Sequence, residues 1–223
     1  MKKIVAIFIM FVLCFSVTAC VGENKKAFEL SKVAYGNVKA AYEITEQYST
    51  DLYEAWRLGI FDKEELYNDG VTYLATKLSL SEDELKEGLV YAIEKKTGGK
   101  LSDNDRADFV DVDNKYVFKV MGDNSSLFSF CVSIVEGAYI ANGKTEKAQV
   151  ALNNAKTQMK ELSESYSDYE HYPNLKGYYT TTSSFFDFCQ NPDASFDQIK
   201  DTINNYKKEA RDFENDLDFI FED

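Results

Sequence analysis

The chain has 223 residues, of which 38 are acidic and 25 are basic, and its formal net charge at pH 7 is −13. This charge makes nucleic acids and other polyanions poor partners. His171 is the only histidine, so sites that need two imidazoles, such as paired-histidine zinc sites, are excluded.

The first residues have the pattern of a secretion signal. Lys2 and Lys3 precede an uninterrupted apolar run from Ile4 to Phe15, and a charged segment followed by a short apolar one is typical of such signals. The run is too short to remain as a membrane-spanning anchor. We therefore expect it to direct export.

The apolar run ends shortly before Val17-Thr18-Ala19-Cys20. These residues resemble the lipobox of bacterial lipoproteins, in which a small residue precedes the cysteine that becomes lipidated. The resemblance covers residues 1–20 only. It implies that residues 1–19 are removed as a signal peptide, that Cys20 carries acyl chains such as palmitate, and that the protein is located on the extracytoplasmic face of the cell membrane, at the cell surface.

On this interpretation, residues 20–25 are the lipidated cysteine and a short tether. Removal of residues 1–19 takes away two lysines and changes the net charge to about −15. Because such a charge repels anionic headgroups, we expect the acyl chains, and not the protein surface, to hold the domain at the membrane.

The remaining residues, 26–223, have the apolar spacing of one all-α domain. Apolar residues recur at intervals of three and four over 24–58, 63–78, 82–96, 145–166, 173–189 and 195–220, which is typical of amphipathic helices packed side by side. Residues 125–141 are apolar nearly all round, as expected of a central helix. We predict a single elongated bundle of about six to seven helices.

Several helix ends have recognisable signals. Ser81 with Glu84, and Ser195 with Gln198, have the spacing of capping boxes. Gly98 is expected to end one helix, and Asn142-Gly143 to end another. Thr145 is the predicted N-cap of the helix that follows.

The region from 102 to 121 is ambiguous. Its four valines favour a strand, whereas Phe109, Val112, Tyr116 and Val120 also lie at helical spacing. We predict a helix, with a short β-hairpin near 109–120, turning at Asp113-Asn114, as the alternative.

No residue pattern predicts catalysis, a metal or a cofactor. Gly143-Lys144-Thr145 resembles the end of a phosphate-binding loop, but the glycine required five positions earlier is Ala138. The aspartates between 103 and 113 lack the spacing of a calcium loop. Cys131 and Cys189 fall on apolar stripes, so we expect two buried thiols, although a disulfide stays open as an alternative.

The most suggestive stretch is rich in tyrosine. Tyrosines offer stacking faces and hydroxyls, and neighbouring carboxylates favour a positively charged ligand or partner. The alternative is that these aromatic residues simply cap the end of the core. The candidate contact residues are Tyr166, Asp168, Tyr169, Glu170, His171, Tyr172, Tyr178 and Tyr179.

Together these observations predict a membrane-anchored, non-enzymatic binding or interaction module. Its partner is an unidentified protein or small molecule. The alternatives are a structural or accessory subunit of a cell-envelope complex, for which an exposed apolar face on the first or last helix would be evidence, and a hydrolase with paired carboxylates.

Overall fold

A computed structural model describes the backbone of residues 2–111, 114–121, 126–192 and 195–222, and the side chains of residues 24–109, 116–120, 126–192 and 195–222. The side chains of the signal segment and of Cys20 therefore lie outside the described residues. The nine helices within the described ranges are α1 (Lys2–Phe61), α2 (Lys63–Lys77), α3 (Glu82–Thr97), α4 (Asp103–Asp111), α5 (Asn114–Met121), α6 (Leu127–Ala141), α7 (Lys144–Ser165), α8 (Tyr172–Gln190) and α9 (Phe196–Phe221).

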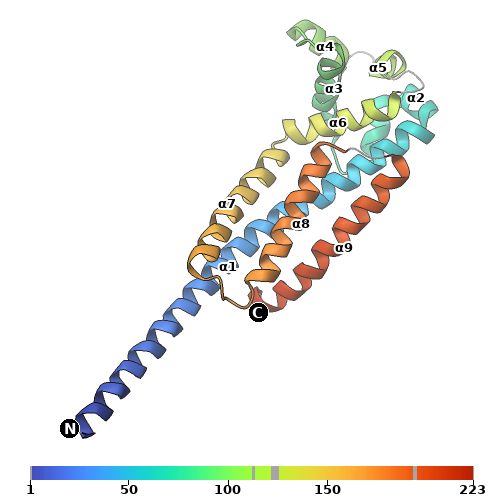
Figure 1. Cartoon of the computed structure of the whole chain (residues 1–223). Helices are drawn as coiled ribbons and strands as arrows, with labels where there is room; N and C mark the ends of the chain where they lie inside the picture. The colour runs from blue at the N-terminus through green and yellow to red at the C-terminus, as the bar shows by residue number, and fades with distance from the viewer. Residues whose placement is uncertain (1, 112–113, 122–125, 193–194, 223) are drawn as a thin grey trace.

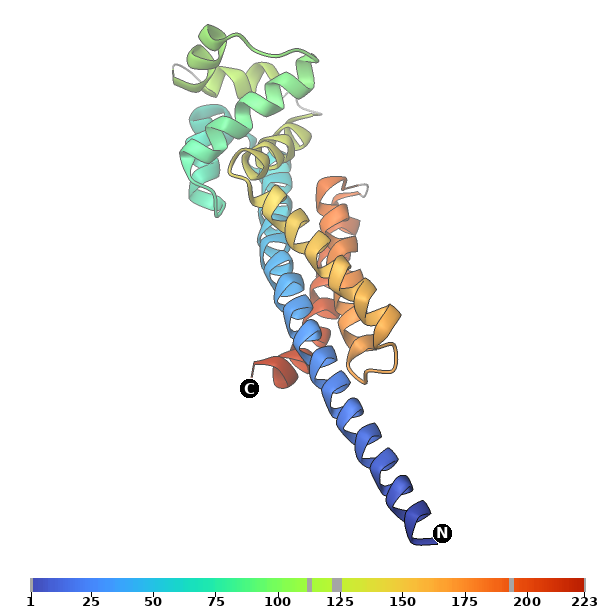
Figure 2. The ribbon, with the colours of Figure 1, turned by 90° about the vertical axis from the view of Figure 1, so that its left-hand side faces the viewer.

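Four of these helices form an elongated bundle. Helices α1, α7, α8 and α9 run alongside one another with alternating direction, and α6 lies across the end of the bundle that is distant from the chain's N-terminus (Figures 1 and 2). Helices α2 to α5 gather at that distant end, where α3 packs on α6 and α5 packs on α2. The turn between α7 and α8 and the C-terminus lie together at the opposite end (Figure 1).

Helix α1 is in contact with all the other helices of the bundle. It contacts α2, α6, α7, α8 and α9, and its buried residues include Ala34, Tyr35, Val38, Ala41 and Tyr42. These positions cover more than one narrow stripe, which agrees with the wide apolar face of the sequence. The all-α bundle is confirmed.

The helix ends follow their sequence signals with one correction. The Ser81 Oγ accepts a hydrogen bond from the Glu84 N–H, and the Ser195 N–H donates to Gln198 Oε1 at 3.1 Å. Gly98 closes α3 with a left-handed φ of 72°. The predicted N-cap at Thr145 is wrong, because α7 begins one residue earlier, and Asn142 Oδ1 accepts from the Lys144 N–H at 3.0 Å.

The ambiguous region is helical. Residues 103–111 and 114–121 form α4 and α5, so the hairpin near 109–120 is not seen in the described residues. Asn114 of its expected turn is the first residue of α5, and Asp113 lies outside the described residues. Val117 and Phe118 are buried, whereas Tyr116 and Val120 are exposed. This one-sided burial is a helical pattern. Together with helices at the seven other expected ranges, α4 and α5 make nine helices in the described residues, slightly more than the predicted six to seven.

Candidate functional site

The predicted contact residues from Tyr166 to Tyr172 form the turn that joins α7 to α8. The Tyr166 N–H donates to the Leu162 carbonyl at 2.8 Å, which completes the last turn of α7. The Tyr169 N–H then donates to the Tyr166 carbonyl, and the Tyr172 N–H donates to the Tyr169 carbonyl, each at 3.0 Å. Consecutive backbone hydrogen bonds therefore fix the conformation of the turn.

Aromatic contacts hold this turn on the end of the bundle. The Tyr169 and His171 rings meet edge to face with centroids 5.3 Å apart, and His171 meets Phe221 of α9 at 6.4 Å. Phe221 in turn contacts Phe28 and Tyr35 of α1, each at 5.5 Å. The turn is thus connected by rings to the first and last helices.

The two carboxylates of the turn face solvent. Asp168 and Glu170 are exposed, whereas Tyr169, His171 and Tyr172 are partly buried. The Glu170 Oε1 lies 3.2 Å from His171 Nε2. Partial burial, with the negative charge of Glu170 beside it, raises the pKa of Tyr169 above its usual value of 10.0. The turn therefore presents negative charge next to partly exposed aromatic faces.

Tyr178 and Tyr179 lie elsewhere, in α8. Tyr178 is fully buried, with its ring centroid 5.9 Å from those of Tyr35 and Tyr42, and its hydroxyl has no hydrogen-bond partner among the described residues. Burial raises the pKa of this hydroxyl strongly. Tyr179 packs partly buried against the cluster that contains Ala41 and Leu152. The fold thus brings six of the eight predicted residues together and separates the other two.

An open groove of about 540 Å³ lies beside the turn, between residues 25–33 of α1 and the end of α7. Its lining combines three apolar or aromatic residues with charged residues, and consists of Lys25, Lys26, Glu29, Leu30, Val33, Glu161 and Tyr166. Tyr166 belongs to both the turn and the groove. The sequence did contain a signal for the groove, because Val33 is an apolar residue outside the buried stripes of α1, and it is 53% exposed.

An ion cluster fixes α9 on α1 near this end. Lys39 Nζ lies 2.9 Å from Asp218 Oδ1 and 2.6 Å from Glu222 Oε1, and the Tyr35 hydroxyl donates to Asp218. The hydrogen bonds from Lys39 to Glu222 and Asp218 raise the pKa of the lysine. Burial acts to raise the pKa of Asp218, but the hydrogen bonds from Tyr35 and Lys39 outweigh it and lower the value.

A second polar cluster lies near the other end of the bundle, and the sequence analysis missed it. Asp51 of α1 is 2% exposed. Its carboxylate accepts from the Ser79 N–H at 2.9 Å, from the Ser79 hydroxyl at 2.5 Å and from the Tyr139 hydroxyl at 2.8 Å. The signal in the sequence was a carboxylate at a position flanked by the core residues Tyr48 and Leu52.

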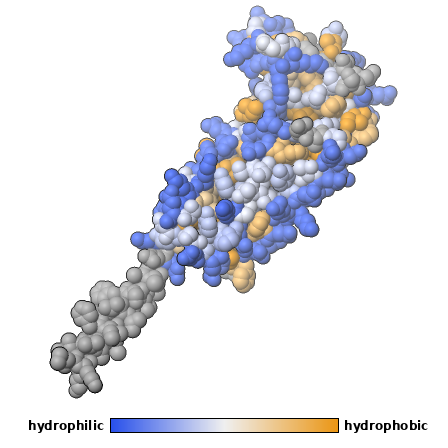
Figure 3. Space-filling model, viewed as in Figure 1, coloured by the Kyte–Doolittle hydropathy of each residue, from blue (hydrophilic) through white to orange (hydrophobic). Residues whose placement is uncertain are grey.

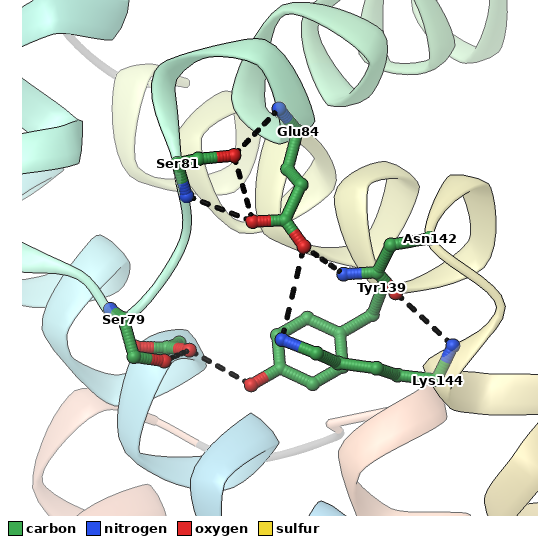
Figure 4. Close-up of polar contacts among 7 residues, drawn as sticks. Ser79, Ser81, Glu84, Tyr139, Asn142 and Lys144 are labelled. Carbon is green, nitrogen blue, oxygen red and sulfur yellow. Dashed lines mark hydrogen bonds and ion pairs between the residues drawn. The ribbon is translucent and has the colours of Figure 1, made fainter.

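The same region contains a bridge from α3 to the start of α7 (Figure 4). Glu84 accepts from the Ser81 N–H at 2.8 Å and from Asn142 Nδ2 at 2.7 Å, and Lys144 Nζ lies 3.8 Å away. Burial alone would raise the pKa of Glu84, but these hydrogen bonds and the lysine charge lower it below 4.5. Protein groups occupy the acceptor oxygens of both carboxylates, which suits a structural connection between helices.

Further features of the described residues bear on function. Cys131 and Cys189 are both buried and free, and burial raises the pKa of both thiols. Within the described part of the chain, no group of three or more histidine, cysteine, aspartate or glutamate side chains is arranged to hold a metal. Over the same residues, no helix is long and apolar enough to cross a membrane.

Comparisons with protein-family models, with curated proteins and with solved structures find no match to this chain.

Proposed function

We propose that the protein is an extracytoplasmic lipoprotein whose helical bundle is anchored to the cell membrane through Cys20 and acts as a non-enzymatic interaction module. The partner surface is the turn from Tyr166 to Tyr172. The partner is a protein segment with positive charge, because the exposed side chains at this turn include two carboxylates beside aromatic faces.

The observation that carries this proposal is the fixed presentation of the turn. Its aromatic rings contact α1 and α9, while Asp168 and Glu170 point into solvent. A surface that is already ordered loses little conformational entropy when a partner binds. The turn also lies at the end of the bundle where the α1 residues that follow the predicted anchor begin to pack, so the partner would be met close to the membrane.

The test is a pull-down from detergent-solubilised membranes of the host. The bait is the full chain, compared with the double variant Asp168→Asn/Glu170→Gln. The matched control is Asp201→Asn/Glu209→Gln, which removes two exposed charges from α9. We expect a stoichiometric partner with the unchanged chain and the control, and a severalfold loss with the turn variant. Equal recovery by all three baits would contradict this choice of surface.

A second candidate function is that of an accessory subunit in a cell-envelope assembly. It is favoured by Phe219 on α9, which is 79% exposed although the neighbouring Phe221 is buried. Replacing Phe219 with serine leaves the core intact, so the variant should fold normally. Loss of this variant from a native membrane complex, with binding at the turn unchanged, would favour the accessory role.

A further inference from the structure

We propose that one acyl chain of the lipid on Cys20 lies in the groove between α1 and α7. This inference rests on the proposed function, because it requires the lipid anchor. It concerns the groove lined by Lys25, Leu30, Val33 and Tyr166, and leaves the exposed carboxylates of the neighbouring turn available to a partner.

The groove lies between α1 and the last turns of α7 and continues along α1 past the end of α7. Asn37 Nδ2 donates to Gln158 Oε1 at 3.3 Å, which marks the place where the two helices are in contact. Helix α7 ends at Ser165, whereas the described side chains of α1 continue back to residue 24. Leu30 and Val33 therefore line the groove together with Glu161 of α7, whereas Lys25 and Lys26 lie past the end of α7.

The groove has the dimensions and the lining of a site for an alkyl chain. From Lys25 to Val33, α1 advances by about 12 Å, which is close to the length of hydrocarbon in one leaflet, about 15 Å. Leu30, Val33 and Tyr166 supply apolar surface. The charged residues of the lining, Lys25, Lys26, Glu29 and Glu161, are all exposed, so an apolar chain between them leaves them hydrated.

The groove lies close to Cys20 in the sequence, which makes the protein's own lipid the expected occupant. Cys20 precedes Lys25 by five residues, a separation of at most about 17 Å even when the backbone is fully extended. So short a connection gives the attached chain a high effective concentration at the groove. An alkyl chain is in an apolar environment both in the bilayer and in the groove, so its own transfer contributes little free energy. The favourable free energy comes from removing the apolar lining of the groove from water.

The experiment uses cells supplied with a fatty acid that carries a photoactivatable diazirine, so that the probe is incorporated into the lipid on Cys20. After illumination, the full chain is purified and the crosslinked peptides are identified by mass spectrometry. We expect intramolecular crosslinks from the Cys20 lipid to the peptides that contain Leu30, Val33 and Tyr166.

Two variants of the groove are matched to a control. Val33→Glu and Val33→Asp each place a carboxylate in the groove, while Val150→Glu makes the same charge change on α7 outside the groove. Val33 and Val150 are 53% and 50% exposed, so circular dichroism should show all three folded. We expect the intramolecular crosslinks to fall about tenfold or more in both Val33 variants, because an apolar chain in the groove would take an unpaired carboxylate out of water, and to persist in Val150→Glu.

Two results would overturn the inference, and they differ in meaning. If Cys20 carries the probe but its crosslinks reach only phospholipids, another protein or helices away from the groove, the chain does not occupy the groove, and the anchor stands. If mass spectrometry finds no lipid on Cys20, both the anchor and this inference fail.

Discussion

Asp51 is a charged side chain that the fold buries almost completely, and its surroundings explain how this is tolerated. Removing a carboxylate from water is costly unless hydrogen bonds replace the lost hydration. Ser79 supplies two of these bonds and Tyr139 supplies a third. The same bonds connect α1 with the α2–α3 connection and with α6, so a buried charge holds the cap of short helices on the bundle.

Replacing Tyr139 with phenylalanine should therefore be costly. The change keeps the ring but removes one donor from a buried carboxylate, and such hydrogen bonds contribute about 1.5–3 kcal/mol. We expect the free energy of unfolding to fall by about that amount in urea denaturation. Tyr116→Phe is the control, because Tyr116 is 65% exposed and its change should stay within about 0.5 kcal/mol. Equal effects of the two changes would show that Asp51 does not depend on the Tyr139 hydroxyl.

The hydrogen-bonded carboxylate of Glu84 should make the free energy of unfolding depend on pH. Its pKa in the folded state is below the ordinary value of 4.5, so the ionised carboxylate stabilises the fold fully above about pH 4.5, and this contribution is lost as the pH falls through the folded pKa. In unfolding measurements at several pH values, the stability difference between the unchanged chain and Glu84→Gln should be largest at neutral pH and should narrow below about pH 4.5. A difference that is constant with pH would contradict the role of Glu84.

The close contact between α3 and α6 requires glycine at position 88, because a side chain there would clash with the α6 backbone. A Cβ at Gly88 would lie 2.9 Å from the Ala138 nitrogen and 3.0 Å from the Ile134 carbonyl carbon, which are backbone atoms that cannot move aside cheaply. Gly36 on α1 is the opposite case, because a Cβ there would meet no neighbouring element within 4 Å among the described residues. Replacing each glycine with alanine therefore tests helix packing at Gly88 and helix propensity at Gly36.

We expect Gly88→Ala to lower the free energy of unfolding by about 1–3 kcal/mol or more through overpacking. Gly36→Ala should raise it by about 0.5–1 kcal/mol, because alanine is the better helix former. Thermal or urea unfolding of the two variants measures both effects. A stabilised Gly88→Ala variant would mean that α3 and α6 are not in close contact in solution.

Most of the helices could be predicted because the features that specify them, apolar spacing and capping residues, are local in the sequence. Spacing of apolar residues located α2, α3, α6, α7, α8 and α9, and the capping boxes at Ser81 and Ser195 marked two starts. The region of α4 and α5 was ambiguous because its valines favour a strand whereas the spacing of its apolar residues also fits a helix, and packing decides between them. The start of α7 is also set locally, because Asn142 and Gly143 end one helix and begin the next, so that α7 starts before the predicted N-cap Thr145.

The candidate site was only partly predictable, because it depends on where helices end relative to one another. The sequence identified the tyrosine-rich turn, yet Tyr178 follows the buried stripe of α8 and lies in the core. The groove depends on the place along α1 at which α7 ends. The burial of Asp51 depends on hydrogen-bond partners that are 28 and 88 residues away in the sequence. Such long-range pairings have no local signature.

The molecule as a whole has two different ends. The cap of short helices α2 to α5 lies at one end, and the turn and the C-terminus lie at the other (Figures 1 and 2). The groove lies beside the turn, since Tyr166 is part of both. Hydrophilic residues cover much of the face seen in Figure 3, with hydrophobic residues gathered in small areas between them. If Cys20 is the anchor, the turn and the groove lie toward the membrane and the cap points away from it.

The measurement that tests this arrangement most directly is the intact mass of the protein purified from membranes of its host. We predict a chain that begins at Cys20, lacks residues 1–19 and carries the additional mass of a diacylglycerol-type lipid, while Cys20→Ser stays unprocessed and without lipid. A mature chain that begins at another residue, or that has no lipid mass on Cys20, would contradict the membrane-anchored module.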